Sequence, residues 1–499
     1  DTFNKLCQRE RAPFSVIGEA TASGQLQLSD TLFDNQPIDL PLSVLFDNTP
    51  RMQRKDNHIH QQRQPITYEG IDLDDAVNRI LQLPTVADKR FLITIGDRSV
   101  SGLVVRDQMV GPWQTPVADC AITASSYDAY VGEAMAVGER SPVAIINPPA
   151  SGRLALAEAI TNIAASRILM LSDIALSANW MAACGHPGED ANLYDTVEAV
   201  SNLATSLEIC IPVGKDSLSM HTVWEDGEEH KQVISPLSVN ISAFAPVADI
   251  RKTLTPQLIH DKETSLLLID LGSNQNRMGG SALAQVFNQI GDVTPDLDRP
   301  ELLTAFFQAI QLLNEMDLIM SYHDRSDGGL FVTLTEMAFA GHCGIDILLE
   351  CNTNEILANL FSEEAGAVIQ INTEQMEQVC KTFLDSGLAE DKISVIGKIN
   401  NTLNITISNS GTTVFRRDLA ELHALWSSTT INIQTMRDNP QCAQQELESL
   451  LDMNDPGLSL STSFDMNENA GTHSVNKGAK PDIAILREQG VNGHVEMAA

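Results

Sequence analysis

The sequence lacks several features that mark large classes of protein. No apolar run reaches the roughly 18 residues of a membrane span. Its eight cysteines stand singly with no CxxC pair, which favours reduced thiols in a cytoplasm over a disulfide framework or a zinc site. None of them lies in a Gly-x-Cys-x-Gly elbow, and no Ser-His-Asp constellation is recognisable. We therefore expect a cytoplasmic protein without a membrane segment.

Basic residues are also scarce. The chain has 32 Lys and Arg against 66 Asp and Glu, a formal net charge of −34. A protein that binds the phosphate backbone of a nucleic acid needs a basic face, so we expect no nucleic-acid partner. Acidity does not exclude ATP, because metal ions bridge carboxylates and phosphates.

Length and composition fit a multidomain globular protein. With 43% hydrophobic and 5% aromatic residues, the composition is ordinary for a soluble α/β protein. At roughly 150 residues per domain, 499 residues predict about three domains. The chain begins with Asp1 and shows no basic-then-apolar signal pattern, so we expect a cleaved or partial chain.

One internal repeat is visible. Residues 14–28, FSVIGEATASGQLQL, resemble residues 393–407, ISVIGKINNTLNITI. Each predicts a strand, a glycine turn and a second alternating strand. Either the match is chance, or the chain begins with the last strands of one module and contains one further complete module.

The first half of the chain predicts an α/β region after a linker. The polar residues 47–65 read as the linker, and residues 70–84 have the acidic start and apolar spacing of a helix. Residues 91–97, FLITIGD, predict a strand. Residues 141–168 predict a strand, a proline-glycine turn and a long helix, and residues 235–247 alternate as a closing strand.

A second α/β region follows. It begins at residues 264–272, TSLLLIDLG, and helices are predicted over 281–290, 301–319 and 330–340.

The C-terminal part is different in composition. Residues 436–479 are rich in Asn, Gln, Ser and acids, and predict a partly helical, partly loose linker. Residues 480–499 predict a strand, a turn and the start of a helix, which cannot bury itself and suggests a domain cut off near its beginning.

Two segments of the chain contain candidate metal ligands. Glu158 and Asn162 lie four residues apart on one face of a helix with little other charge, so they are either a solvated face or a pair of oxygen ligands for a hard cation. Asp119 stands among small residues before an apolar segment, as a cap or as a ligand.

Three glycine-containing turns are candidate anion sites. Lys89 precedes the turn GDRSVSG, whose backbone amides could cradle phosphates although it is neither a Walker loop nor GxGxxG. Lys215 lies in IPVGKDSLSM, either a hairpin turn or an anion-contacting loop. Gly279 and Gly280 precede a helix and offer free amides or a tight packing turn.

The stretch SYHDRSDGGL, residues 321–330, is the densest polar cluster. Ser326 or Asp327 could cap the following helix. Asp324 lies outside the ideal cap position, and two consecutive glycines permit close approach of backbone to a ligand. His323 is interpreted as a polar neighbour rather than a ligand, since Mg²⁺ prefers oxygen.

Five segments together resemble a known family. The resemblance runs in order over essentially the whole chain, to the large single-chain phosphoribosylformylglycinamidine synthases of purine biosynthesis. It is carried by FLITIGDRSVSGLVVRDQMVGPWQTPVADCAIT, INPPASGRLALAEAITNIAA, PVGKDSLSM, YHDRSDGGL and LREQGVNGHVEMAA. The HDRSDGG element alone also resembles aminoimidazole ribonucleotide synthetase, selenophosphate synthetase and thiamine-monophosphate kinase.

The resemblance implies an α/β (α+β) fold of aminoimidazole ribonucleotide synthetase-like A and B domains, followed by the truncated start of a class I glutamine amidotransferase. The implied boundaries are 1–48 for the end of a first B unit, 49–247 for a second A unit, 248–430 for a second B unit, 431–479 for a linker and 480–499 for the start of the glutaminase. The family's N-terminal domain, first A unit and glutaminase triad then fall outside this sequence. We accordingly expect no glutamine hydrolysis by this polypeptide.

The resemblance also implies an activity. The family converts formylglycinamide ribonucleotide (FGAR), ATP and glutamine into formylglycinamidine ribonucleotide (FGAM), ADP, phosphate and glutamate. ATP activates the amide oxygen as a phosphate ester, and ammonia from glutamine displaces the phosphate. The implied Mg²⁺ ligands are Asp119, Glu158, Asn162 and Asp324, and the implied nucleotide contacts are Lys89, Ala118 and Ser326.

The role of this nucleotide site is left between two alternatives. In the family one such site is catalytic and its pseudo-symmetric mate holds a nucleotide structurally; we favour the structural role here. The chain is then either part of the amidoligase or a nucleotide-stabilised half without turnover of its own. A kinase-like or selenophosphate-type enzyme is the third alternative, and the C-terminal LREQGVNGHVEMAA argues against it. The full-length chain is expected to be monomeric.

Overall fold

The structure is a computed structural model. It describes residues 2–46, 53–59, 61–96, 98–99, 102–260, 263–465, 482–487 and 493–498. The chain divides into two compact units, one made of Asp1–Arg54 with Leu460–Ala499, the other of Lys55–Ser459.

The smaller unit contains little regular structure. Its elements are α1 (Thr2–Arg9), β1 (Gln25–Asp30), β2 (Asn35–Pro41), α2 (Leu42–Phe46) and α16 (His494–Ala498). β1 and β2 form an antiparallel pair, and neither α1 nor α2 has a buried residue.

Two sequence expectations on the smaller unit are wrong. Residues 14–22 contain no strand, so the first copy of the repeat begins its strand only at Gln25. Residues 482–487, where a strand was predicted, contain none, and residues 480–481 and 488–492 lie outside the described residues. An alternating apolar pattern produces a strand only where a neighbouring strand satisfies its backbone, and these segments have none.

The larger unit contains a sheet of six strands in the order β3-β4-β5-β10-β6-β7. All neighbours are antiparallel except β6 and β7. The strands are β3 (Val104–Arg106), β4 (Ala121–Ala124), β5 (Gly132–Glu139), β6 (Ala175–Met181), β7 (Cys210–Ser217) and β10 (Ser238–Val247). Burial alternates along β10, which confirms the strand predicted over 235–247.

A second sheet of seven strands has the order β12-β14-β11-β15-β13-β16-β17. Only β13 and β16 run parallel. The strands are β11 (Thr264–Asp270), β12 (Ser321–Asp324), β13 (Gly344–Leu349), β14 (Gly366–Asn372), β15 (Ile393–Asn400), β16 (Asn404–Asn409) and β17 (Thr412–Asp418). β13 separates β15 from β16, so the second copy of the repeat is two strands that do not pair with each other.

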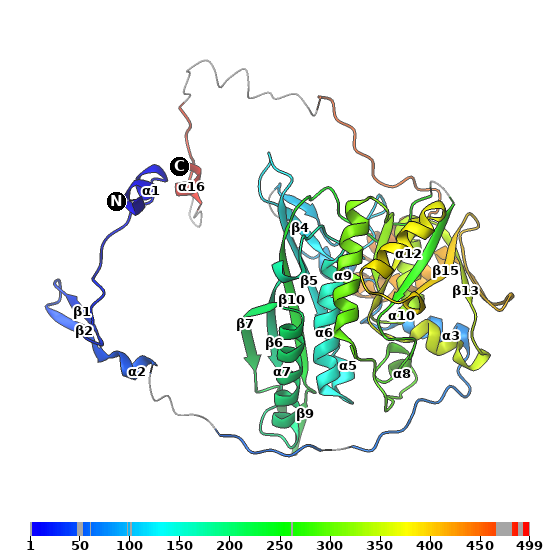
Figure 1. The fold of residues 1–499 in the computed structure, drawn as a ribbon, viewed down its shortest axis with the longest axis horizontal. Coiled ribbons are helices and arrows are strands. Elements are labelled where there is room, and N and C mark those ends of the chain that lie inside the picture. The colour runs from blue at the N-terminus through cyan, green and yellow to red at the C-terminus, as the bar shows by residue number, and fades with distance from the viewer. Residues whose placement is uncertain are drawn as a thin grey trace. The chain divides into compact units, whose positions relative to one another are not determined.

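Helices α6 (Pro148–Ile163) and α9 (Pro300–Glu315) stand side by side between the two sheets (Figure 1). α6 begins where the Asn147 side chain accepts a hydrogen bond from the backbone N of Ala150, and proline occupies its first turn. A Cβ on Gly138 of β5 would lie 2.1 Å from the carbonyl oxygen of Ala155. Glycine therefore lets α6 lie directly on β5, and one apolar core joins both sheets here.

The remaining helices pack around α6, α9 and the two sheets. They are α3 (Leu73–Gln82), α4 (Arg90–Ile93), α5 (Ser141–Ala144), α7 (Glu189–Ser206), α8 (Ala282–Val286), α10 (Gly329–Gly341), α11 (Ile356–Phe361), α12 (Met376–Asp385), α13 (Leu419–Arg437) and α14 (Pro440–Leu450), with a hairpin of β8 (His221–Asp226) and β9 (Glu229–Ile234). α3, α10 and α13 share a second core with β13, β16 and β17, centred on Phe339 and Trp426. The helices predicted over 70–84, 301–319 and 330–340 are confirmed, and the one over 281–290 is shorter than predicted.

Two predicted strands are helical turns. Residues 91–97 were expected as a strand, but Arg90–Ile93 form α4, because the Asp88 carboxylate accepts from the backbone N of Arg90 and so starts a turn. Residues 141–144 form α5 where the strand before α6 was expected.

The two predicted linkers are partly attached to the larger unit. Residues 53–59 and 61–65 contain no helix or strand, yet the Asp56 carboxylate accepts from the backbone N of Gly188, Asp190 and Ala191 at the start of α7. The C-terminal linker begins with the end of α13 and all of α14, and residues 466–479 lie outside the described residues. The domain boundaries stay predictions.

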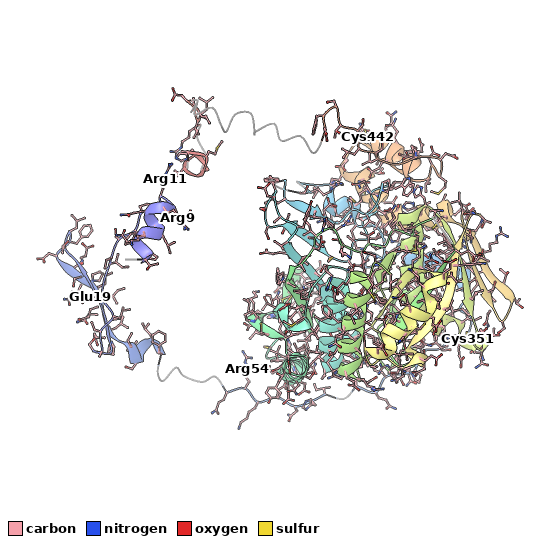
Figure 2. All side chains as sticks on the ribbon, turned by 45° about the horizontal axis from the view of Figure 1, so that its top comes forward. Arg9, Arg11, Glu19, Arg54, Cys351 and Cys442 are labelled. Carbon is pink, nitrogen blue, oxygen red and sulfur yellow. The ribbon has the colours of Figure 1, made fainter. Side chains whose placement is uncertain are left out.

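No disulfide joins any of the described cysteines, and Cys351 and Cys442 lie well apart on the larger unit (Figure 2). No helix among the described residues is both long enough and apolar enough to span a bilayer.

Candidate functional site

The turn between β12 and α10 is fixed by buried polar contacts. Arg325 donates to the Asp270 carboxylate, to the carbonyl of Glu364 at 2.7 Å and to that of Ala365 at 3.1 Å. β12 is the edge strand beside β14, so its last residue, Asp324, stands at the end of the sheet. The polar sequence 321–330 thus leaves the sheet at one defined point.

The two glycines of this turn serve the turn itself. Gly328 and Gly329 have φ of 82° and 66°, in the left-handed region, and a Cβ on Gly329 would lie 2.6 Å from the carbonyl oxygen of Ser362. The close approach is to protein backbone, whereas the sequence suggested a ligand. No side chain caps α10, so the alternative that Ser326 or Asp327 is its cap is wrong.

Asp119, just before β4 of the first sheet, and Asp324, at the end of β12 in the second sheet, come together. Asp119 Oδ1 accepts from His323 Nδ1 at 2.6 Å and from the backbone N of Asp324 at 3.4 Å. The Asp119 side chain is 1% exposed and Asp324 3% exposed. Within the described part of the chain, Oδ2 of Asp119 and Oδ2 of Asp324 are buried without a hydrogen-bond partner. One ligand atom each of Asp119, His323 and Asp324 lies within 4.8 Å of the others.

Burial and like charge act on this pair. The pKa of Asp324 is raised to about 7, first by burial and then by the Asp119 carboxylate, while His323 and Arg140 oppose the rise. Buried carboxylate oxygens without donors are costly, and a cation that pairs with them removes the cost. The two orphan oxygens therefore fit a hard cation.

His323 is held between two acids. Its Nδ1 contacts Asp119, and its Nε2 lies 2.9 Å from Oε2 of Glu336 on α10. Burial lowers the pKa of His323, but Asp119 and Glu336 outweigh burial and raise it well above its ordinary value. His323 is thus a charged neighbour that orients Asp119.

Glu158 and Asn162 project from α6 onto β5, beside this pair. Glu158 Oε2 accepts from the backbone N of Glu139 at 2.8 Å, and Asn162 Nδ2 donates to the carbonyl of Val137 at 3.0 Å. Burial raises the pKa of Glu158 well above its ordinary value; Arg140 opposes this, and Asp324 adds to it. α6 is tied to β12 by a hydrogen bond of 2.5 Å from Tyr322 Oη to the carbonyl of Thr161.

A cavity of about 390 Å³ opens at this point. Of the seven predicted site residues, five line it: Ala118, Asp119, Asn162, Asp324 and Ser326. Its remaining lining is mostly small or apolar, with Asp107, Gln108, Val117, Cys120, Ala121, Met135, Ala136, Val137 and His323.

Glu158 and Lys89 are not in the cavity lining. The Lys89 ammonium donates to the carbonyl of Ala87. Burial lowers the pKa of Lys89, and the carboxylates of Glu336, Asp327 and Asp88 oppose the shift. The charge of these acids therefore acts on the Lys89 ammonium.

The other candidate loops lie outside this cavity. Lys215 lies inside β7, exposed, with its Nζ 2.6 Å from Ser217 Oγ, so the predicted hairpin turn at this position is wrong, while an anion contact by Lys215 stays a prediction. Gly279 and Gly280 pack on Val293 and Pro142, which supports the packing interpretation. A larger cavity, about 550 Å³, lies at the starts of α6 and α7 and holds none of the predicted site residues.

Sequence reasoning missed Arg140, Glu336 and Glu363. Glu336 is the one charge in the apolar helix LFVTLTEMAFA, and that isolation was a usable signal. Arg140 follows β5 in an ordinary charged turn, and Glu363 stands in the pair Glu363-Glu364, so neither had a distinguishing pattern.

Comparison with known proteins agrees with this fold. Residues 88–246 match the FGAR-AT PurM_N-like domain, and residues 265–408 match the AIR synthase related protein C-terminal domain. Three solved structures from Thermotoga maritima are similar: PurL in complex with FGAR (TM-score 0.52, 10% identity), PurL in complex with ATP (0.50, 12%) and PurLQS (0.50, 11%). Each match covers 70% of this chain.

The chain spans about half the length of these matched chains, namely 53%, 52% and 51%. At this identity the structural likeness shows the fold, while the two domain matches show which domain family each matched region belongs to. The six-stranded sheet with α6 lies in the first matched region, and the second matched region contains α10 and the seven-stranded sheet except for β17, which follows it. The chain is therefore a phosphoribosylformylglycinamidine synthase-like protein, with AIR synthase-like N- and C-terminal domains.

Proposed function

We propose that this chain is part of an ATP- and glutamine-dependent amidoligase that converts FGAR to FGAM, and that it carries a Mg-nucleotide site. The observation that carries the site is the pair of buried, unpartnered oxygens, Oδ2 of Asp119 and Oδ2 of Asp324, beside a cavity. Buried polar atoms are normally hydrogen-bonded, so two unpartnered oxygens beside a cavity point to an ion or a water that satisfies them.

The donor set matches Mg²⁺. Asp119 and Asp324 supply carboxylate oxygens, and Glu158 and Asn162 supply a carboxylate and an amide oxygen from α6, which is the hard-ligand chemistry that Mg²⁺ prefers. When bound, the ion neutralises charge on the nucleotide phosphates. His323 holds Asp119 in place through its Nδ1, and Glu336 in turn holds His323 through Nε2. Outer partners of metal ligands commonly act in this way.

The nucleotide contacts are assigned to Ala118 and Ser326, which line the cavity, and to Lys89, which lies outside the lining and whose pKa Glu336 and Asp327 raise against burial. Lys89 reaches phosphate by exchanging its bond to the Ala87 carbonyl for a stronger, charge-assisted one.

The reaction follows from the similarity to PurL, whose solved complexes contain FGAR and ATP. The FGAR amide oxygen takes the terminal phosphoryl group of ATP, leaving ADP. Ammonia then adds at that carbon and phosphate leaves, forming the amidine. This chemistry depends mainly on positioning and electrostatic stabilisation. Glutamine would supply the ammonia through a glutaminase, whose start we assign to 480–499.

A second role, a nucleotide that stabilises the fold without turnover, is supported by one observation. The proposed ligands come from both matched domains, Asp119, Glu158 and Asn162 from the first and Asp324 from the second. A ligand that bridges them binds the folded state alone and stabilises it in proportion to its affinity.

The test separates the two roles. We would measure ATP hydrolysis dependent on FGAR and ammonia, with the purified chain and with a longer gene product that adds the flanking sequence. Turnover that falls in Asp324→Asn supports a catalytic site. Bound ADP after purification, with full turnover retained by the longer Asp324→Asn protein, assigns the site to the stabilising role. Mg²⁺ and nucleotide binding unaffected by Asp324→Asn would overturn the site itself.

A further inference from the structure

We propose that Arg140 is a positioning residue that clamps the β12–α10 turn to the end of β5 and so assembles the two halves of the Mg-nucleotide site. This inference rests on the proposed function, because it names what holds that site together. Arg140 is not itself assigned to metal or nucleotide.

The guanidinium of Arg140 spans the gap between the two matched domains. It follows β5 directly and is 3% exposed. Nη1 donates to Asp327 Oδ1 at 2.6 Å, and Nη2 donates to the carbonyl of Glu363 at 2.8 Å. Because the two bonds leave different nitrogens of one rigid fork, they fix orientation as well as distance.

Glu363 extends the clamp to the rest of the turn. Its Oε1 accepts from the backbone N of Gly328 and of Ala282, both at 2.8 Å, and its Oε2 lies 3.7 Å from Arg140 Nη1. Arg140 therefore holds the turn at Asp327 directly and at Gly328 through Glu363. The same turn carries Asp324 and Ser326, which line the cavity.

Arg140 also balances the charge around the site. The carboxylates of Glu158, Glu363, Asp327 and Asp324 all act on it, and despite burial they raise the pKa of its guanidinium above the usual range. Burial raises the pKa of Asp327, and Arg140 is the first group that opposes that rise. Without this cation the acids would repel one another across the domain boundary.

Another domain-bridging arginine supplies a matched control. Arg153, on α6, donates from Nε to Asp296 Oδ1 at 2.7 Å and from Nη2 to Oδ2 at 2.5 Å. Asp296 belongs to the second matched domain, so this pair crosses the same boundary without touching the turn or the cavity.

The experiment compares Arg140→Lys with Arg153→Lys in the full chain, by titrating Mn²⁺ and counting the free ion by electron paramagnetic resonance. Lysine keeps the charge and loses the fork. We expect Arg140→Lys to weaken Mn²⁺ binding at least about 10-fold and Arg153→Lys less than about 2-fold. Circular dichroism of both should match the wild type.

A second variant keeps the inference testable if Arg140→Lys does not fold. Asp327→Asn removes one partner of the clamp and should also weaken Mn²⁺ binding, and the double variant should lose less than the sum of the single losses. Equal affinities in Arg140→Lys and Arg153→Lys, or in Asp327→Asn and wild type, would overturn the inference. Failure of the proposed function would look different: Mn²⁺ would bind equally to wild type and to Asp324→Asn.

Discussion

Two groups of carboxylates flank the turn between β12 and α10, and they differ in how their oxygens are satisfied. The Asp327 carboxylate accepts from Arg140, while the Glu363 carboxylate accepts from the backbone N of Gly328 and lies 3.7 Å from Arg140. Among the described residues, Asp119 and Asp324 each keep one buried oxygen without a partner. Glu363 is as buried as Asp324, and the Asp327 side chain is 35% exposed, so burial alone does not distinguish the two groups.

This difference separates acids that stabilise the fold from acids whose oxygens remain available to a ligand. A paired buried acid is expensive to break, because its partner is left uncompensated. An unpaired buried acid costs stability while it stays unpaired. The two groups should therefore respond in opposite directions to removal of charge.

The largest effect is expected at a paired acid. Asp270 accepts from Arg325 and from the backbone N of Asn274 at 2.6 Å. Asp270→Asn leaves the Arg325 guanidinium buried without its counter-charge, so we expect a loss of about 3–5 kcal/mol in the free energy of unfolding. Urea denaturation measures it. A loss below about 1 kcal/mol would show that pairing does not set the stability of this turn.

The unpaired acid should show the opposite sign. The pKa of Asp324 is raised from 3.8 to about 7 in the folded chain, so the folded state holds the proton more tightly and stability falls as pH rises across that window. The fall is at most about 1.4 kcal/mol per pH unit. Asp324→Asn should remove this fall, as measured by urea denaturation with a chelator present.

Addition of Mg²⁺ extends this test. In the wild type, the ion should restore the stability lost towards neutral pH, because it binds the deprotonated carboxylates. In Asp324→Asn it should have little effect. A wild type whose stability rises with pH across this window, without metal, would contradict the account.

A third buried group tests whether orphan atoms alone mark a site. Among the described residues, both ring nitrogens of His423 lack a partner, and the ring stacks on Phe339 with the ring centroids 4.4 Å apart; His423 is not in the lining of the site cavity. Burial lowers the pKa of His423 to about 3, so stability is complete above about pH 6.5 and is lost as pH falls from there.

His423→Phe keeps the stack and removes the titrating group. We expect a shallower acid limb, by up to about 1.4 kcal/mol per pH unit, in denaturation followed at several pH values. Mn²⁺ affinity should stay at the wild-type value. Altered metal binding in this variant would mean that unpaired polar atoms do not locate the ligand.

The smallest effect is expected at Lys215. This lysine is exposed on β7, and its ammonium donates a hydrogen bond to the Ser217 hydroxyl. Lys215→Ala should change stability by less than about 0.5 kcal/mol and leave ATP affinity unchanged. A clear loss of ATP affinity, measured by calorimetry, would restore this strand as a nucleotide contact.

The sequence was informative where the pattern was long. α6, α9 and α10 were predictable because apolar spacing ran over several turns, and β10 because alternation covered ten residues. Residues 91–97 failed because a short apolar run is compatible with either a strand or a helix. The Asp88 carboxylate accepts from the backbone N of Arg90 just before the run and favours a helical turn there.

The site was predictable only in part, for a physical reason. Asp119, Asn162 and Asp324 lie in recognisable sequence motifs, and the structure brings them to one cavity. Arg140 and Glu336 act across distances of 187 and 13 residues along the chain, through Asp327 and His323. Such pairs leave no local pattern in the sequence, because tertiary packing, and not the spacing of residues along the chain, decides which side chains meet.

The most direct test of the central claim is calorimetric titration of ADP into the chain, with Mg²⁺ and with chelator, for wild type and for the double variant Asp119→Asn/Asp324→Asn. The account predicts one ADP site in the wild type, weakened at least about 10-fold by the chelator, and no Mg²⁺ dependence in the double variant. ADP binding of equal strength in all four titrations would contradict it.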